Sequence, residues 1–319
     1  MIRAAIDIGT VTTRLLIGEL QQHTPTSIET LDYRLAITNL GEGLGASGSI
    51  SEAACQRLIQ TLTEFAEAIA AVKASQLFQC SGQQELPLTI VATSAIRDAA
   101  NAEAVRTRLR GLGFEIEVIS GSREAELSFL GTVSGFSGLA GNLASIDVGG
   151  GSTELILGTQ AGQIAYAHSF DIGSRRVTER FLTSDPPRLS QLDELRAWIE
   201  RQLEPVVAAL PARASEVLAV AGSATSAITI RDRIGVYDSA LVHGKRLRLA
   251  ELEALIQKLA LLPLAERKRV TGLHPGRAEV IVGGLVILAA MLRALGRQSL
   301  IVSDMDILQG ILLAAPAIC

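Results

Sequence analysis

Short apolar runs separated by glycine-containing turns open the chain and predict β-strands. Residues 2–8 and 13–20 form two such runs, joined by a turn, as in a hairpin. A strongly helical stretch follows at 51–73, with Ser49 and Glu52 at capping-box spacing before it. Further on, the pattern predicts, in chain order, a strand at 88–93, a helix at 101–113, a strand at 114–120 and a helix at 123–133.

The second half of the chain repeats this order. Its expected elements are strands at 143–148, 153–158 and 163–170, helices at 174–182 and 190–208, strands at 216–221 and 299–303, and a last helix at 304–314. A run of strands followed by helix, strand and helix therefore occurs twice, which predicts an α/β fold of mixed sheets covered by helices. We expect one domain over 1–122, with a closing helix at 303–319 packing back on it, and a second domain over 123–302.

The repetition extends to single residues. Residues 4–18 read AAIDIGTVTTRLLIG and residues 144–158 read ASIDVGGGSTELILG. The matched pairs are Asp7 and Asp147, Gly9 and Gly149, Thr12 and Ser152, Thr13 and Thr153, and Gly18 and Gly158. A pattern built twice in one chain is more informative than either copy alone.

Composition narrows the class of protein. The 319 residues are 48% hydrophobic and 19% charged, which is typical of a globular protein with enough chain for two cores. The formal charge of −4 argues against duplex nucleic acid as the main partner, so a polyanionic substrate would need local basic groups. Cys55, Cys80 and Cys319 are odd in number and lack zinc spacing, which indicates a reducing compartment.

No segment predicts a membrane location. Asp7 interrupts the first apolar residues, so we expect no secretory signal. The longest apolar stretch, 280–292, has thirteen residues, too few to span a bilayer, and is expected to be a buried helix. We expect a cytoplasmic protein with no membrane partner; the sequence leaves the oligomeric state open and is compatible with a homodimer.

The second glycine turn has the residues of a phosphate site. Glycine has no Cβ, so a run of glycines can turn tightly and present backbone N–H groups to an anion. Here the run is Gly149, Gly150 and Gly151. Ser152 adds a hydroxyl donor, and Asp147 can hold a divalent cation. No lysine completes a Walker loop, and no helix follows the glycines as dinucleotide binding requires. The alternative is an ordinary glycine-rich hairpin; two copies facing each other across a cleft favour phosphate binding.

Glu124 is the first of three further candidates. It falls in the first turn of a helix after Gly121, where the helix dipole favours an ionised carboxylate that can act as a base. The alternative is a common helix-stabilising glutamate.

The other two candidates follow strand ends, where ligands bind in open α/β sheets. Arg97 offers a guanidinium suited to phosphate oxygens, or else pairs structurally with Asp98. Gly222, Ser223 and Thr225 open a helix and could bind a phosphate group, or else serve as a routine cap.

Together these segments resemble the exopolyphosphatase / guanosine pentaphosphate phosphohydrolase (Ppx/GppA) family, in its short two-domain form. The resemblance runs through the motifs IDIGT, TSAIRD, ISGSREAE, IDVGGGSTE, HPGRAEVIVGG and IVSDMDILQG. It implies two actin-like (ribonuclease H-like) domains around a central cleft, dependence on Mg²⁺ or another divalent cation, and removal of a terminal phosphate by water.

The resemblance also implies roles. Glu124 would be the catalytic base, and Asp147 and Glu154 would hold the metal. The phosphate-binding positions would be Gly149, Gly150, Gly151 and Ser152, with Gly9, Thr10 and Thr12 facing them from the first domain, Arg97 on the chain of phosphates, and Gly222, Ser223 and Thr225 in the later loop.

Three positions depart from the family pattern. Arg123 stands where many relatives have an acid, Gly222-Ser223-Ala224 replaces Gly-Gly-Thr, and Val11 replaces a common Asn. Substrate preference is therefore open between polyphosphate and guanosine pentaphosphate. An actin-like kinase and a non-enzymatic sensor of guanosine tetra- or pentaphosphate are the rival functions.

Overall fold

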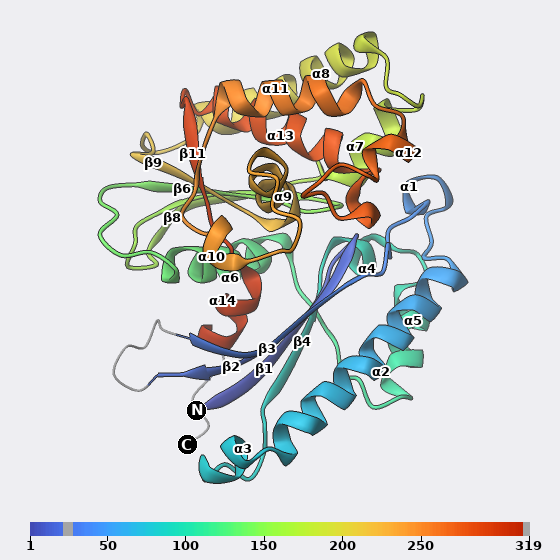
Figure 1. The fold of residues 1–319 in the computed structure, drawn as a ribbon, viewed down its shortest axis with the longest axis vertical. Coiled ribbons are helices and arrows are strands. Elements are labelled where there is room, and N and C mark those ends of the chain that lie inside the picture. Colours follow the sequence, from blue (N-terminus) through green and yellow to red (C-terminus); the bar gives the residue numbers. More distant parts are fainter. Residues whose placement is uncertain (22–27, 315–319) are drawn as a thin grey trace. The chain divides into compact units, whose positions relative to one another are not determined.

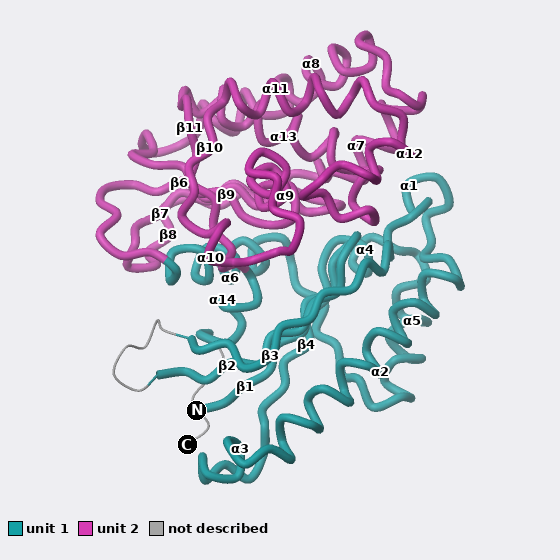
Figure 2. Tube along the Cα trace, in the orientation of Figure 1, with its two compact units in different colours: residues 1–135, 307–319 teal, residues 136–306 magenta. Residues whose placement is uncertain are grey.

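The computed structural model describes residues 1–21 and 28–314. These form two compact units, one made of Met1–Gly135 with the chain from Ile307 onward, the other of Phe136–Asp306 (Figure 2). No helix of the described residues is long and apolar enough to cross a membrane.

The first unit is a five-stranded mixed sheet with helices on both faces (Figure 1). Its strands stand in the order β3-β2-β1-β4-β5, where β1–β2 and β2–β3 are antiparallel and β4 and β5 run parallel to β1. Its elements are β1 (Ile2–Ile8), β2 (Thr12–Leu20), β3 (Ile28–Ile37), α1 (Leu44–Ser47), α2 (Glu52–Ala74), α3 (Gln76–Cys80), β4 (Leu88–Ala92), α4 (Ser94–Asp98), α5 (Ala102–Arg110), β5 (Glu117–Val118), α6 (Gly121–Ser134) and α14 (Ile307–Ala314).

Alternation along the strands divides the core of this unit. Ile6 and Ile8 face α2, whose buried residues such as Leu58 and Leu62 recur at helical spacing. On the other face, Ala5 lies in a smaller cluster with residues of α6 and α14.

Helices α6 and α14 approach closely. A Cβ on Gly310 would lie 1.8 Å from the carbonyl oxygen of Leu127, so only glycine permits this backbone contact. The division into domains 1–122 and 123–302 stays a prediction, and the compact units differ from it by assigning α6 to the first unit. The closing helix is described as far as Ala314; residues 315–319 of the expected 303–319 segment lie outside the described residues.

The second unit repeats the arrangement of the first. Its sheet order is β10-β11-β9-β6-β7-β8, in which β6, β7, β8, β9 and β11 correspond to β1, β2, β3, β4 and β5. Its elements are β6 (Leu143–Val148), β7 (Thr153–Gly158), β8 (Ile164–Phe170), α7 (Ser174–Phe181), α8 (Leu189–Ala208), β9 (Glu216–Val220), α9 (Ala221–Arg231), α10 (Ser239–Val242), β10 (Arg246–Arg248), α11 (Leu249–Ala260), α12 (Leu264–Arg267), the 3₁₀ turn η1 (Pro275–Arg277), α13 (Ile281–Ala294) and β11 (Ser299–Val302).

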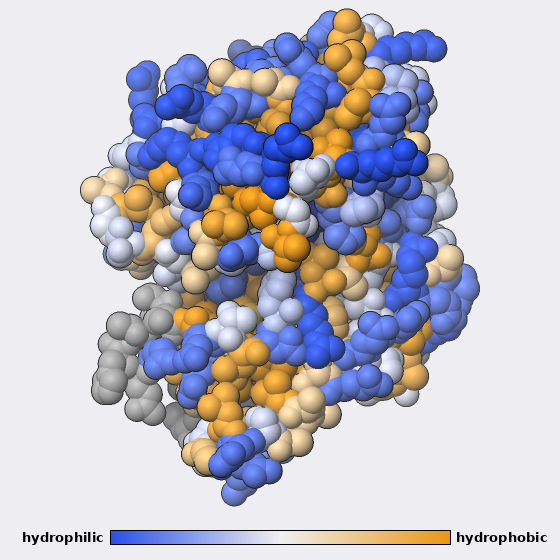
Figure 3. All heavy atoms as spheres, in the orientation of Figure 1, coloured by the Kyte–Doolittle hydropathy of each residue, from blue (hydrophilic) through white to orange (hydrophobic). Residues whose placement is uncertain are grey.

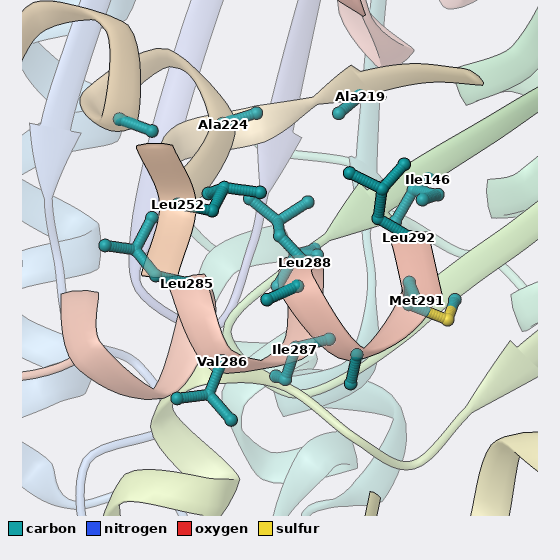
Figure 4. Close-up of a cluster of buried hydrophobic side chains, with 14 of the residues drawn as sticks. Ile146, Ala219, Ala224, Leu252, Leu285, Val286, Ile287, Leu288, Met291 and Leu292 are labelled. Atoms are coloured by element: carbon teal, nitrogen blue, oxygen red, sulfur yellow. The ribbon is translucent and has the colours of Figure 1, made fainter. Parts of the chain in front are cut away.

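The apolar stretch expected to be a buried helix is α13, which lies in the core of this unit. Leu288 and Leu292 of α13 belong to one buried cluster with Ile146 and Ala219 of the sheet (Figure 4). Every residue from Ile281 to Leu292 is buried, which explains why this helix shows no polar face in the sequence.

Two local expectations were wrong. The N-cap of α2 is Ser51, whose hydroxyl accepts a hydrogen bond from the N–H of Ala54 at 3.2 Å, so Ser49 and Glu52 do not form the capping box. The expected strand at 114–120 is reduced to Glu117–Val118, because only these residues pair with β4.

Candidate active site

The two hairpins have the same register. Asp7 stands opposite Arg14 in the β1–β2 pair, and Asp147 stands opposite Glu154 in the β6–β7 pair. Each turn is closed by an equivalent backbone bond, from Gly9 N–H to the Thr12 carbonyl at 2.9 Å and from Gly149 N–H to the Ser152 carbonyl at 3.0 Å. The duplication read from the sequence is therefore a duplication of backbone geometry.

The charges at these matched positions differ. Asp7 accepts hydrogen bonds from Arg14 Nη2 at 2.7 Å and Nε at 3.2 Å, and both side chains are largely buried. In the second hairpin two carboxylates oppose each other, with Asp147 8% and Glu154 1% exposed. Ser169 of β8 donates its hydroxyl to Glu154 Oε1 at 2.7 Å. Facing carboxylates at a buried position favour a cation between them.

The carbonyl groups of the second turn are held by α7. Ser174 N–H donates to the Gly149 carbonyl and Arg175 N–H to the Gly150 carbonyl, both at 2.9 Å. The Gly151 carbonyl accepts from Arg176 Nε at 2.9 Å. Because these carbonyl oxygens bond to α7 and the Gly149 N–H closes the turn, the N–H groups of Gly150, Gly151 and Ser152 are the backbone donors suited to a ligand.

The first turn is held in the same way by the segment after β3. The carbonyl oxygens of Thr10 and Val11 accept from Gly41 and Asn39 N–H, each at 2.9 Å. The first turn contains one glycine, Gly9, where the second contains three. In the second turn, a Cβ on Gly173 would lie 2.3 Å from the Gly150 carbonyl oxygen, so the chain packs there with no room for side chains.

Glu124 and Arg97 lie together in the first unit. Arg97 Nη1 donates to Glu124 Oε2 at 3.2 Å and to the Ile119 carbonyl at 3.1 Å, while Arg97 Nε lies 3.7 Å from Asp98 Oδ1. The structural pairing with Asp98 is thus present, but the shorter contact is with Glu124. Glu124 does not cap α6, since Ser120 does so by accepting from Arg123 N–H at 3.2 Å. Its nearly buried carboxylate is instead fixed by the guanidinium.

The loop from β9 into α9 carries Gly222, Ser223 and Thr225. Ala221 begins the helix at φ 65°, a left-handed conformation that costs energy for alanine. Thr225 Oγ1 donates to the Ala221 carbonyl at 3.3 Å. Arg277 of η1 donates from Nη1 to the Gly222 carbonyl at 3.3 Å, so this loop has a guanidinium beside it.

Arg277 is not among the site residues that the sequence predicts, because it lies 55 residues from Gly222 in the chain. Only its place in the HPGRAEVIVGG motif could have indicated it. Its neighbour His274 has its pKa lowered from 6.5 by burial and, secondarily, by the positive charge of Arg277. A phosphate at this loop would therefore meet the permanent positive charge of Arg277.

A magnesium ion fits the second hairpin by the chemistry of its donors. Asp147 and Glu154 present carboxylate oxygens on one face of the sheet, and Mg²⁺ prefers one or two carboxylates completed by water and phosphate oxygens. The described residues contain no cluster of three or more His, Cys, Asp or Glu side chains able to hold a metal. Two carboxylates leave coordination positions for water and phosphate oxygens, so the donor set suits a metal shared with a phosphate substrate.

The structure thus places the sequence-predicted site residues in five groups. Each group lies within one unit: Glu124 with Arg97 in the first unit, Asp147 with Glu154 in the second, Gly222, Ser223 and Thr225 in the α9 loop, and the turn residues within their own hairpins, which are Gly9, Thr10 and Thr12 in the first and Gly149, Gly150, Gly151 and Ser152 in the second. Their catalytic and binding roles stay predictions.

Comparison with known proteins gives consistent matches. The family model described as the Ppx/GppA phosphatase family matches residues 20–315. The chain is 33% identical to "Exopolyphosphatase 2" of Mycobacterium tuberculosis (strain ATCC 25618 / H37Rv), covering 98% of this chain and 97% of the relative.

Solved structures agree with this match. A crystal structure of an exopolyphosphatase-like protein is 31% identical with a TM-score of 0.88, covering 98% of this chain and 96% of the other. The Aquifex aeolicus member of the Ppx/GppA family is 28% identical with a TM-score of 0.79, covering 98% and 97%. The predicted class, a mixed α/β fold with two actin-like domains, is confirmed by these structures and by the two matching sheets.

Proposed function

The chain belongs to the Ppx/GppA phosphatase family, and on this premise we propose that it is an exopolyphosphatase. It releases the terminal orthophosphate of inorganic polyphosphate by attack of water, with Mg²⁺ as the cofactor. The observation that carries the proposal is the pairing of Glu124 with Arg97, which holds a carboxylate beside a phosphate-binding cation. The relatives named exopolyphosphatase favour polyphosphate as the substrate.

Glu124 takes the proton of the attacking water. Phosphoryl transfer depends more on positioning and charge neutralisation than on covalent help, so a carboxylate that orients water is sufficient. Both hydrogen bonds of Arg97 start from Nη1. Nη2 can therefore bind a phosphate oxygen while Nη1 keeps Glu124 in place.

Asp147 and Glu154 would hold the cation. When bound, Mg²⁺ would neutralise charge that develops on the phosphate oxygens. Glu154 is oriented for this role by the Ser169 hydroxyl on the neighbouring strand. The chain's contribution is to keep two oxygen ligands at fixed positions in a rigid hairpin.

The phosphates of the substrate are bound by backbone N–H groups and hydroxyls. Those of the second turn come from Gly149 to Ser152, and Gly9, Thr10 and Thr12 supply the corresponding groups of the first turn. The α9 loop adds Gly222, Ser223 and Thr225.

Phosphate release measured side by side tests the proposal. The substrates are tripolyphosphate, long polyphosphate, guanosine pentaphosphate and ATP, each with Mg²⁺ and with chelator. We expect the highest kcat/KM with polyphosphate and no release without a divalent cation. Preference for guanosine pentaphosphate would identify a guanosine pentaphosphate 5′-phosphohydrolase instead, and tight binding of that nucleotide without turnover would identify a sensor. Phosphate transfer from ATP to a small acceptor would identify a kinase.

Glu126→Gln is the matched control for Glu124→Gln. Both glutamates lie on α6, but Glu126 is exposed and pairs with Arg123 at 2.9 Å. Loss of phosphate release in both variants would contradict the assignment of the base to Glu124.

A further inference from the structure

A basic segment of the second unit lies between α12 and α13. Over residues 268–277 it carries Lys268, Arg269, His274 and Arg277 and no acidic side chain. Lys268 and Arg269 are exposed. Figure 3 shows strongly hydrophilic side chains gathered over the region where Figure 1 labels α12.

The two ends of this segment are fixed by one buried guanidinium. Arg267, which is 4% exposed, donates to the carbonyl oxygens of Leu259 at 3.1 Å and Leu262 at 2.9 Å, before the segment. It also donates to Ala278, just after the segment, at 3.1 Å. The intervening residues therefore form a closed loop with a defined conformation, which lowers the entropic cost of binding a ligand.

The segment runs along α9 towards the candidate phosphate loop. Gly272 adopts φ 88°, and a Cβ there would lie 2.1 Å from the Thr229 carbonyl oxygen, so the loop backbone touches the helix. Thr229 Oγ1 donates to the Gly272 carbonyl at 2.5 Å, and Arg277 reaches the Gly222 carbonyl. Thr229 and Gly222 are seven residues apart, which is about 10 Å along a helix. Lys268 and Arg269 lie beyond Gly272 in the chain, on the side away from Arg277.

Lys268 and Arg269 differ from most basic residues of the protein. Within residues 1–21 and 28–314, neither side chain makes an ion pair or hydrogen bond. By contrast, Arg196, Arg231 and Arg246 of the same unit each pair with an acidic residue. Two cations that the fold does not neutralise can bind an anion without first giving up a partner.

The length of the basic segment, together with the α9 loop that it reaches, indicates the ligand. A single phosphate group cannot reach from Gly222 past Thr229, whereas a chain of phosphates can. The segment has no Phe, Tyr or Trp on which bases could stack, which argues against single-stranded nucleic acid.

We propose that Lys268 and Arg269 bind the distal phosphates of a long polyphosphate whose terminal phosphates lie at the α9 loop, and thereby favour long chains as substrates. The inference rests on the proposed function. It assigns to two surface side chains a part in substrate length selection.

The double variant Lys268→Ala/Arg269→Ala tests this. With long polyphosphate we expect KM to rise about five- to tenfold, the effect of losing two exposed charge contacts, with kcat nearly unchanged. With tripolyphosphate, kcat and KM should stay within about twofold, because so short a chain does not extend past the loop. The matched control is Arg201→Ala/Lys258→Ala, which removes two exposed basic side chains of α8 and α11. The control variant should leave kcat and KM unchanged with both substrates.

Equal effects on long polyphosphate and tripolyphosphate, or no effect on either, would overturn the inference. A second measurement keeps it separate from the proposed function. In a Glu124→Gln background, calorimetric binding of long polyphosphate should weaken about five- to tenfold on adding Lys268→Ala/Arg269→Ala. If the wild type released no phosphate from any polyphosphate, the proposed function would fail. Unchanged binding in the Glu124→Gln background would reject only the role of Lys268 and Arg269.

Discussion

The two hairpins share one backbone and carry opposite chemistry at one position. Opposite Asp7 stands Arg14, which supplies a cation from the chain itself. Opposite Asp147 stands Glu154, a second acid. The facing residue is thus a base in the first hairpin and an acid in the second. On the proposed function, the second hairpin would bind the cation.

The loops that follow the central strands differ in a related way. Val91 pairs with Asp7 and Val220 with Asp147, so the β4–α4 and β9–α9 loops are equivalent. The first takes its arginine, Arg97, from its own short helix. The second is completed by Arg277, which comes from a distant turn.

The largest expected effect is that of Glu124→Gln. We expect turnover to fall at least about a hundredfold, the usual loss for a positioned general base, while polyphosphate binding and Mg²⁺ binding persist. The amide keeps the shape of the side chain, so the melting temperature should stay near that of the wild type. Steady-state phosphate release and calorimetry check this. Turnover within a few-fold of wild type would place the base elsewhere, with Glu126 or Glu154 the next carboxylates to test.

A stability comparison of Arg14→Gln with Glu154→Gln comes next. Removing Arg14 leaves the buried Asp7 carboxylate without its cation and should lower the free energy of unfolding by about 3 kcal/mol. In chelator, Glu154→Gln removes the acid that faces Asp147. The free energy of unfolding should then stay the same or rise by less than about 1 kcal/mol. Urea unfolding of both variants measures the difference. A fall of similar size in both would show that the hairpins are electrostatically alike.

Asp147→Asn should lower phosphate release at least about tenfold at fixed Mg²⁺, because metal affinity is lost with the ligand. Part of the activity should return as the Mg²⁺ concentration is raised. The control is Asp193→Asn on α8, an exposed acid of the same unit. Wild-type turnover with unchanged Mg²⁺ dependence in a folded Asp147→Asn variant would end the metal assignment.

The smallest expected effect is on the pH dependence of stability, through His274 near the β9–α9 loop. The pKa of His274 is lowered in the folded protein by burial and by Arg277. The unfolded chain therefore binds this proton more readily, so the contribution of neutral His274 to stability is present above about pH 6.5 and is lost as the pH falls. Melting temperatures at pH 7.5 and 5.5 should differ more in the wild type than in His274→Asn, which keeps a cap acceptor for Gly276 N–H. An identical decrease in melting temperature in both proteins would exclude His274 as the group responsible.

The sequence predicted the parts that depend on local pattern. The repeated frame at Asp7 and Asp147 correctly predicted two hairpins of one register and two matching sheets, because apolar alternation and glycine turns fix strand pairing. The buried α13 followed from its unbroken apolar run. Contacts between distant segments could not be found in this way. Arg97 meets Glu124 across 27 residues and Arg277 meets Gly222 across 55, distances at which sequence spacing carries no geometric information.

Local competition explains the smaller errors. Two serines precede α2, and only the hydrogen bond to Ala54 decides that Ser51 is the cap. The 114–120 segment has strand composition but pairs with β4 at Glu117 and Val118 alone. Propensity selects the region, while tertiary pairing selects the residues.

Calorimetric titration of Mg²⁺ into the wild type, Asp147→Asn and Asp7→Asn tests the central contrast most directly. The account predicts one divalent site in the wild type, its loss in Asp147→Asn, and its retention in a folded Asp7→Asn variant, since Arg14 and not a metal faces that position. Circular dichroism establishes that each variant is folded. Undiminished Mg²⁺ binding in Asp147→Asn, or equal loss in Asp7→Asn, would contradict the account.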